Sequence, residues 1–295
     1  MRTLQRQTVG LLLFTVVFAI ALVFSLLFQS KEPLKGQADP ATAASVVSNH
    51  QRIAEQLQAL PAVGTFVYGK SGLGANLNCI RILPDKPVKT SVLMTLEIHG
   101  YEDAYAKDGQ VLVDIGNAVI AWASSNRSVL DTTALYVVPS ANPDGLADGI
   151  SQNGKGRCQM SLGVNINRDF PTGFKVIANA RDHTLAAPLA APESQALVDL
   201  VTQIKPAVVV DVHGWEDHVL GNAAIASFFL PVTVSKRFSA FDAKCNGFFS
   251  LWASTQGAES ILLELPRTTK GVYPVDFYSS RIENSISALV QSPGE

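Results

Sequence analysis

Short apolar runs alternate with longer amphipathic stretches along most of this chain, and that alternation limits the fold more than any other feature. Such runs are typical of strands that a sheet buries on both faces. The expected strands cover residues 91–98, 134–138, 207–212 and 261–265, and the expected helices between them cover 111–123 and 193–204. This order predicts an α/β fold, with an open, mostly parallel (mixed) sheet flanked by helices.

The N-terminal segment 9–28 is apolar and carries no charge. As a helix its 20 residues would rise about 30 Å, the thickness of a hydrocarbon core. It is longer than the apolar core of a signal peptide, and a poor cleavage site follows it. These features favour a retained transmembrane helix in the inner membrane over a cleaved, secreted form. Arg2 and Arg6 precede it, which predicts an extracytoplasmic (periplasmic) location for the rest of the chain.

The expected organisation therefore has four parts. Residues 1–8 form a cytoplasmic N-terminus, 9–28 the anchor, and 29–44 a linker with scattered proline and glycine. Residues 45–295 form one domain, which opens with an amphipathic helix at 45–60.

Composition and local motifs exclude several classes of function. A formal net charge of −2 leaves no basic excess, so no nucleic-acid partner is expected. Three scattered cysteines exclude a disulfide framework and a cysteine zinc site, although one bridge with one free thiol stays open. Residues 64–71 match a phosphate-binding loop literally, but 65–68 has the pattern of a strand and no helix follows, so nucleotide binding is not expected.

Two of the five histidines directly follow expected strands, where α/β sheets present ligands. These are His99 and His213. Glu102 lies three residues after His99, and Gly100 permits the bend that would turn both side chains toward one point. Two histidines and one carboxylate form the ligand set of catalytic zinc sites, which keep a fourth position for water. The same set also suits iron or cobalt.

A single carboxylate, Glu264, lies inside an apolar strand, where its burial is costly without a role or a partner. Desolvation would raise its pKa, which is how enzymes poise a general base. Its flanking leucines argue against a strand that merely turns a polar face outward. Asp211 lies two residues before His213 on the same side of the strand and offers a carboxylate near it. The remaining histidines, expected at the surface, are His50, His183 and His218, the last in a polar loop.

Taken together, these positions resemble the zinc carboxypeptidase family from about residue 67 to residue 266. Six elements occur in the family's order, which is far more specific than any one of them. They are Tyr68-Gly-Lys-Ser71, His99-Gly-Tyr-Glu102, Asn142-Pro-Asp-Gly145, the stretch 163–171 (GVNINRDFP), Asp211-Val-His213 and Leu263-Glu-Leu265. The resemblance implies one zinc ion held by His99, Glu102 and His213, with Glu264 as the general base.

The resemblance also assigns residues to the substrate. Asn167 and Arg168 would hold its terminal carboxylate, for which an arginine fork has the right geometry. Arg157 would stabilise the oxyanion, with Lys155 as a rival for that role.

The sequence departs from the family pattern at two places, and the second of them resembles one branch of the family. Asn165 and Asp169 exchange the usual Asp and Asn around the Asn167-Arg168 pair, and the stretch 245–252 has no tyrosine. That stretch is similar to the compact bacterial branch that includes the murein peptide amidases. The similarity implies cleavage of the γ-D-glutamyl–diaminopimelate bond of cell-wall peptides.

The expected function is thus a zinc metallocarboxypeptidase, a peptidase or amidase that hydrolyses a bond next to a terminal carboxylate in peptidoglycan stem peptides. Arg168 with an acid such as Asp169 would complement the carboxylate and the ammonium of diaminopimelate. Three alternatives stay open: a carboxypeptidase for ordinary L-peptides, an amidohydrolase for small acyl amino acids, and a non-catalytic cell-wall binding protein.

Overall fold

The computed structural model of the chain describes residues 40–150 and 157–292. The expected N-terminal segment 1–8, the anchor 9–28 and residues 29–39 of the linker lie outside these ranges. Within the described ranges, none of the helices combines the length and the apolar character needed to cross a bilayer. The contacts divide the chain into two units, Met1–Ser45 and Val46–Glu295, and the second contains the sheet.

Helix α2 (Pro40–Ala59) begins five residues earlier than the helix expected from residue 45. Proline is well suited to the first turn of a helix, where its missing N–H has no partner to lose. The rest of α2 confirms the expected amphipathic helix, and Ile53 on its apolar side is fully buried.

The sheet has eight strands in the order β1-β2-β4-β3-β5-β8-β6-β7. Its four central strands run parallel to one another and confirm the four expected apolar runs. Nearly all their residues are buried, which is why their sequences lack a polar alternation. These strands are β3 (Thr90–Leu96), β4 (Thr133–Val138), β5 (Val208–Gly214) and β8 (Glu259–Leu265).

Antiparallel strands extend both edges of the parallel core, which makes the sheet mixed as expected. On one side β1 (Val63–Lys70) and β2 (Asn76–Ile82) form a hairpin. Because β1 covers residues 64–70 of the sequence that matches the phosphate-binding loop, the strand expected at 65–68 is confirmed. On the other side lie β6 (His218–Gly221) and β7 (Arg237–Ser239), while β9 (Arg267–Thr268) and β10 (Gly271–Val272) pair separately.

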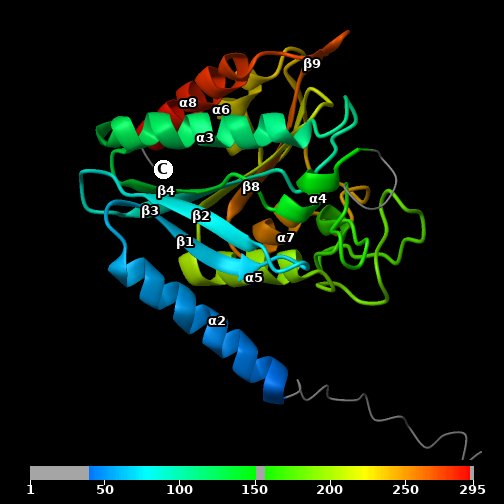
Figure 1. The fold of residues 1–295 in the computed structure, drawn as a ribbon. Coiled ribbons are helices and arrows are strands. Elements are labelled where there is room, and N and C mark those ends of the chain that lie inside the picture. The colour runs from blue at the N-terminus through cyan, green and yellow to red at the C-terminus, as the bar shows by residue number, and fades with distance from the viewer. Residues whose placement is uncertain (1–39, 151–156, 293–295) are drawn as a thin grey trace, which may run out of the picture. The chain divides into compact units, whose positions relative to one another are not determined.

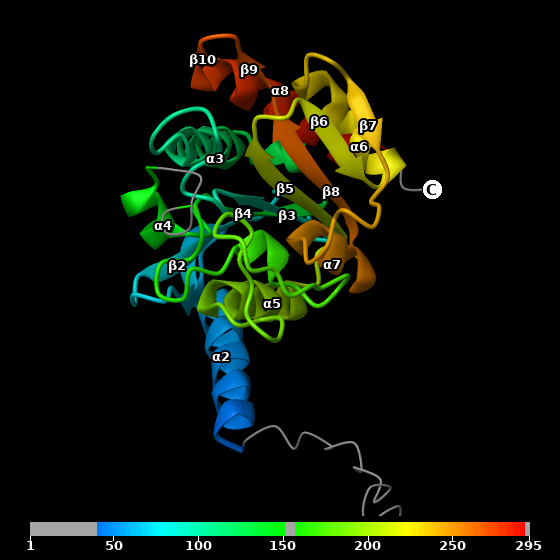
Figure 2. The ribbon, with the colours of Figure 1, turned by 90° about the vertical axis from the view of Figure 1, so that its right-hand side faces the viewer.

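Helices cover both faces of the sheet (Figures 1 and 2). One face carries α3 (Gly109–Ser125), α6 (Ala223–Phe229) and α8 (Val275–Gln291), whose apolar side chains form one core with the sheet. The opposite face carries α5 (Pro192–Ile204) and α7 (Phe249–Thr255), which form a second core. The short helical segments are α4 (Pro143–Asp148), η1 (Arg127–Leu130), η2 (Ile166–Arg168) and η3 (Leu230–Val232).

The strand order reverses beside β3. The two neighbours of β3 in the sheet are β4 and β5. The chain reaches β4 through α3, which packs on one face of the sheet, and reaches β5 through α5, which packs on the opposite face. Ligands of open α/β sheets bind at such a reversal, beyond the carboxyl ends of the strands. The carboxyl ends of β3 and β5 are where the expected metal ligands lie.

Candidate metal centre

The three expected metal ligands meet at the carboxyl ends of β3 and β5. His99 follows β3, His213 lies in β5, and Glu102 stands between them; all three are almost completely buried. Nδ1 of His99 lies 3.1 Å from Oε2 of Glu102, and Nδ1 of His213 lies 3.2 Å from Oε1 of the same carboxylate. The sequence prediction that these residues gather is confirmed.

The turn that carries Glu102 is closed by Asp108, a residue that sequence reasoning missed. The carboxylate of Asp108 accepts hydrogen bonds from the backbone N–H groups of Glu102 at 2.5 Å and Ala104 at 2.7 Å. Nε1 of Trp215, just after β5, donates to it at 2.9 Å. In sequence, Asp108 has the pattern of an ordinary helix cap before α3, which hides this role.

A neutral acceptor fixes the tautomer of His99. Nε2 of His99 lies 2.9 Å from Oδ1 of Asn165, whose Nδ2 donates to the backbone oxygen of Arg181 at 3.0 Å. That donation sets the orientation of the amide, so Oδ1 must face His99 and Nε2 must carry the proton. The lone pair of Nδ1 is then directed toward Glu102, as metal binding requires.

A carboxylate supports His213 in the same way. Oδ2 of Asp211, buried in β5, lies 3.1 Å from Nε2 of His213, and Thr95 donates its hydroxyl to Oδ1 at 2.8 Å. The expected placement of Asp211 is therefore confirmed. Burial acts to lower the pKa of His213, but the carboxylates of Asp211 and Glu102 outweigh it and raise that pKa.

These residues fit a zinc ion. Their donor atoms lie within 4.8 Å of one another, and the two distances to Glu102 are near the roughly 3.3 Å between neighbouring ligands of a tetrahedral zinc. Burial and the guanidinium of Arg157 lower the pKa of His99 to about 4, so its imidazole is neutral at pH 7. Although burial acts to raise the pKa of Glu102, the two imidazoles hold it well below its usual range, so the carboxylate is ionised.

Glu264 stands beside this cluster. It is the register partner of His213 across β5 and β8, and partners in a parallel pair point to the same face. Its Oε2 is buried and has no hydrogen-bond partner in the part of the chain that the structure describes. Burial raises the pKa of Glu264 to about 7, and the nearby imidazole of His213 opposes this only in part. An orphaned buried polar group costs about 1–3 kcal/mol, and this one belongs to a carboxyl next to the metal ligands, where a general base is expected.

Arg157 lies on the other side of Glu102. Its Nη1 donates to the backbone oxygen of Tyr101 at 2.8 Å and lies 3.4 Å from Oδ1 of Asp103 and 3.6 Å from Oε2 of Glu102. Its Nε is buried without a partner among residues 40–150 and 157–292. The position suits the expected contact with an oxyanion, which stays a prediction. Lys155, the rival, lies outside the described residues.

Arg168 is accessible at the site, whereas Asn167 is buried. Oδ1 of Asn167 accepts the backbone N–H of Phe249 at 2.9 Å, and its Nδ2 lies 3.4 Å from Nε2 of His213. Nη1 of Arg168 donates to the backbone oxygen of Asn167 at 2.8 Å, and its side chain is 19% exposed. Their contact with a substrate carboxylate stays a prediction, and of the two side chains only Arg168 is open to a ligand.

The suggestion that Asp169 is the acid available to a substrate ammonium beside Arg168 is wrong. Asp169 is fully buried, and its two oxygens accept the backbone N–H groups of Ala190 at 3.2 Å and Ala191 at 2.9 Å. It therefore holds the segment before α5 in place. The acid beside Arg168 is Asp182, whose Oδ1 lies 3.2 Å from Nη2 of Arg168.

The other histidines and the cysteines have structural positions. His218 opens β6, so its expected place in a loop is wrong. His50 pairs with Asp199 at 3.0 Å, and Nδ1 of His183 lies 3.2 Å from the backbone oxygen of Ile177. The cysteines are all buried and unbridged; they are Cys79, Cys158 and Cys245.

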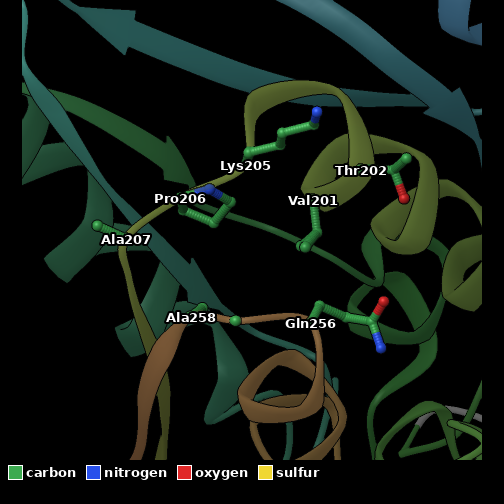
Figure 3. A pocket seen from close by; sticks show the side chains of 8 residues that line it. Val201, Thr202, Lys205, Pro206, Ala207, Gln256 and Ala258 are labelled. Carbon is green, nitrogen blue, oxygen red and sulfur yellow. The ribbon is translucent and has the colours of Figure 1, made fainter.

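A cavity at the opposite end of the sheet has a different character (Figure 3). It measures about 320 Å³ and lies at the amino ends of β5 and β8, lined by residues 201–202, 205–207 and 256–258. Lys205 is the one charged side chain among these lining residues. The cavity has no group of metal-binding side chains among its lining residues. The candidate metal ligands lie at the carboxyl ends of the strands instead.

Comparisons with known proteins agree with this geometry. The family model of zinc carboxypeptidases matches residues 51–226. The chain is 35% identical over 235 residues to bacteriocin BCN5 of Clostridium perfringens, covering 77% of this chain and 26% of that protein. It thus spans about a quarter of the length of that relative. It is 28% identical over 224 residues to murein peptide amidase A of Escherichia coli K12, covering 69% of this chain and 81% of the relative.

Solved structures share the fold. Carboxypeptidase A from Helicoverpa armigera superposes with a TM-score of 0.60 at 19% identity, covering 84% of this chain and 71% of that one. Murein-tripeptide amidase MpaA from Escherichia coli O157 gives a TM-score of 0.54 at 24% identity, covering 80% of this chain and 95% of that one. The mixed sheet flanked by helices is therefore a carboxypeptidase-like fold, as expected.

Proposed function

Because this chain belongs to the zinc carboxypeptidase family, we propose that it hydrolyses a bond next to a terminal carboxylate in peptidoglycan stem peptides. The bond is a peptide bond or the γ-D-glutamyl–diaminopimelate amide. The chain is a metallocarboxypeptidase-type hydrolase with zinc as its cofactor, and His99, Glu102 and His213 are the residues that hold it.

The observation that carries hydrolysis is the buried Oε2 of Glu264, which has no hydrogen-bond partner among the described residues and belongs to the register partner of His213. When bound, zinc polarises the scissile carbonyl and lowers the pKa of a water molecule. Glu264 accepts a proton from the attacking water and passes it to the leaving nitrogen. A pKa of about 7 suits a group that must both take and return a proton near neutral pH.

Two arginines complete the proposed site. Arg168 receives the terminal carboxylate of the substrate, since its guanidinium is partly exposed and held in place by the backbone of Asn167. Arg157 stabilises the negative charge that develops on the carbonyl oxygen, since it is buried next to the metal ligands and its Nε has no partner within residues 40–150 and 157–292.

The substrate class rests on the likeness to murein peptide amidase A, which extends over 81% of that relative. Cleavage of ordinary L-peptides is the second candidate, because the metal ligands and the Asn167-Arg168 pair suit it equally well. A non-catalytic cell-wall binding protein is disfavoured. Binding alone gives no reason to bury Oε2 of Glu264, which has no hydrogen-bond partner in the described part of the chain.

The proposed location is the outer side of the inner membrane, with residues 9–28 as the anchor. The support is the uncharged apolar stretch and the arginines before it, Arg2 and Arg6. In untreated spheroplasts the domain should be recovered in the membrane fraction. Protease added to intact spheroplasts should degrade the domain. Full protection from the protease would contradict this location.

The test of the function uses the full chain in detergent, loaded with zinc, and a mixture of muropeptides and ordinary L-peptides. Chelator-sensitive release of diaminopimelate, measured by mass spectrometry, would support the proposal. Trimming of L-peptides alone would support the second candidate. Zinc binding without cleavage of either group, identical in wild type and Glu264→Gln, would support a binding protein.

A further inference from the structure

The guanidinium of Arg168 is already paired before any substrate arrives. Its Nη2 lies 3.2 Å from Oδ1 of Asp182, its Nη1 donates to the backbone of Asn167, and its Cζ lies 4.6 Å from the ring centroid of Phe248. These contacts fix its orientation. A carboxylate that approaches Arg168 therefore meets an ion pair rather than a free cation.

Asp182 is held by one of its two oxygens. Oδ1 faces Arg168 and also accepts Nδ2 of Asn165 at 3.4 Å, while the backbone N–H of Asp182 donates to Oδ1 of Asn179 at 2.9 Å. Within 40–150 and 157–292, no hydrogen bond or ion pair is formed by Oδ2, and 24% of the side chain is exposed. The carboxylate is therefore fixed in place and still has an oxygen for a ligand.

Asn165 joins this acid to the metal centre. Its Nδ2 contacts Asp182, and its Oδ1 accepts Nε2 of His99, so one amide separates Asp182 from a metal ligand. Asp182 thus lies at the edge of the site, on the side where Arg168 would bind the terminal carboxylate of the substrate. If Arg168 binds the terminal carboxylate, an acid at this position would lie near the residue that carries it.

The charge pattern discriminates between terminal residues. A terminal residue with a neutral side chain brings one carboxylate, which must compete with Asp182 for Arg168. A terminal residue that also brings an ammonium group gives Asp182 a new partner, so both charges of the ion pair are matched. Hydrogen bonds between charged groups are roughly twice as strong as neutral ones, so the difference is large enough to measure.

We propose that Asp182 is a specificity-determining residue, which selects terminal residues that carry an ammonium group in addition to the carboxylate bound by Arg168. Diaminopimelate and lysine belong to this class, and norleucine has the four-carbon side chain of lysine without its ε-ammonium group. The inference rests on the proposed function, since it takes Arg168 as the carboxylate site of that reaction.

The test is calorimetric binding of lysine, diaminopimelate and norleucine to the zinc-loaded full chain in detergent, which requires no turnover. Each ligand is acetylated on its α-nitrogen, so that this nitrogen is an uncharged amide as in a peptide and only the side chain of lysine or diaminopimelate brings an ammonium group. Wild type is expected to bind lysine and diaminopimelate about tenfold or more tightly than norleucine. In Asp182→Asn the ratio is expected to fall to about one, mainly through weaker binding of the two diamino acids, while norleucine binds as well as before or better. The zinc content of each variant confirms that the metal centre is intact.

A matched control is Asp85→Asn, which removes the acid of another ion pair, 3.1 Å from Nη2 of Arg127 and outside the site. It should leave the ratio unchanged. Equal affinity of wild type for lysine and norleucine, including no binding of either, would overturn the inference. So would an unchanged ratio in Asp182→Asn, or an equal loss for all three ligands. Failure of the proposed function would give a different result. Muropeptides would stay intact, while the ratio of the affinities for lysine and norleucine would still depend on Asp182.

Discussion

Asp211 places its Oδ2 3.1 Å from Nε2 of His213, two residues along the same strand. His99 has a neutral amide, Asn165, in the equivalent position. One metal-binding imidazole is therefore supported by a full negative charge and the other by a dipole. The charged contact makes His213 the more basic ligand.

Removal of that charge should weaken zinc binding. In Asp211→Asn the dissociation constant for zinc is expected to rise about 10–100-fold, as measured by competition with a chromophoric chelator. Asp199→Asn is a matched control, because Asp199 pairs with His50 at 3.0 Å outside the site. An unchanged zinc affinity in Asp211→Asn would show that the amide and the carboxylate support these histidines equally.

Glu264→Gln should separate metal binding from hydrolysis. The amide keeps the shape of the side chain but cannot accept a proton, so kcat is expected to fall by about 10²–10⁴-fold. Zinc affinity should stay within a few-fold of wild type, because Glu264 is not one of the three ligands. Peptide hydrolysis and zinc content measured on the same preparation check this. Loss of zinc in parallel with activity would contradict the role of a base.

The same substitution should stabilise the metal-free protein at high pH. Burial raises the pKa of Glu264 from 4.5 in the unfolded chain to about 7 in the folded one. A raised pKa means that the folded state favours the protonated carboxyl, so this contribution to stability is complete below pH 4.5 and is lost as the pH rises through 7. Glutamine cannot ionise and escapes the loss.

Urea unfolding in the presence of a chelator measures this effect. The free energy of unfolding of Glu264→Gln relative to wild type should increase by on the order of 1–3 kcal/mol between pH 5 and pH 8. A difference between the two proteins that does not change with pH would mean that the carboxyl is solvated in the folded state.

Asp108 should matter for both stability and zinc binding. Asp108→Ala leaves the buried indole N–H of Trp215 and the backbone N–H of Glu102 without their acceptor. The metal-free protein is expected to lose about 2–4 kcal/mol of unfolding free energy, with weaker zinc binding because the turn that directs Glu102 loosens. Asp108→Asn retains one acceptor oxygen and should lose less in denaturant titrations. Equal losses in the two variants would refute the hydrogen-bonding argument.

The sequence predicted the sheet well because its central strands are buried on both faces, and burial leaves an apolar run that needs no structure to recognise. The ligands His99, Glu102 and His213 could also be predicted from the sequence, since two of them directly follow such runs. The acid next to Arg168 could not be predicted. Asp169 is adjacent in sequence, but its carboxylate accepts hydrogen bonds from the backbone N–H groups of Ala190 and Ala191. The carboxylate that lies next to Arg168 belongs to Asp182, in a loop.

The reversal of strand order beside β3 also affects when the site can form during synthesis. Glu102 and His213 are 111 residues apart in the chain, and Glu264 follows in a later strand of the sheet. A nascent chain thus carries its metal ligands before it carries its base. A chain that ends before β8 therefore contains the three proposed metal ligands but lacks the proposed base, so the complete site requires β8 in its place between β5 and β6.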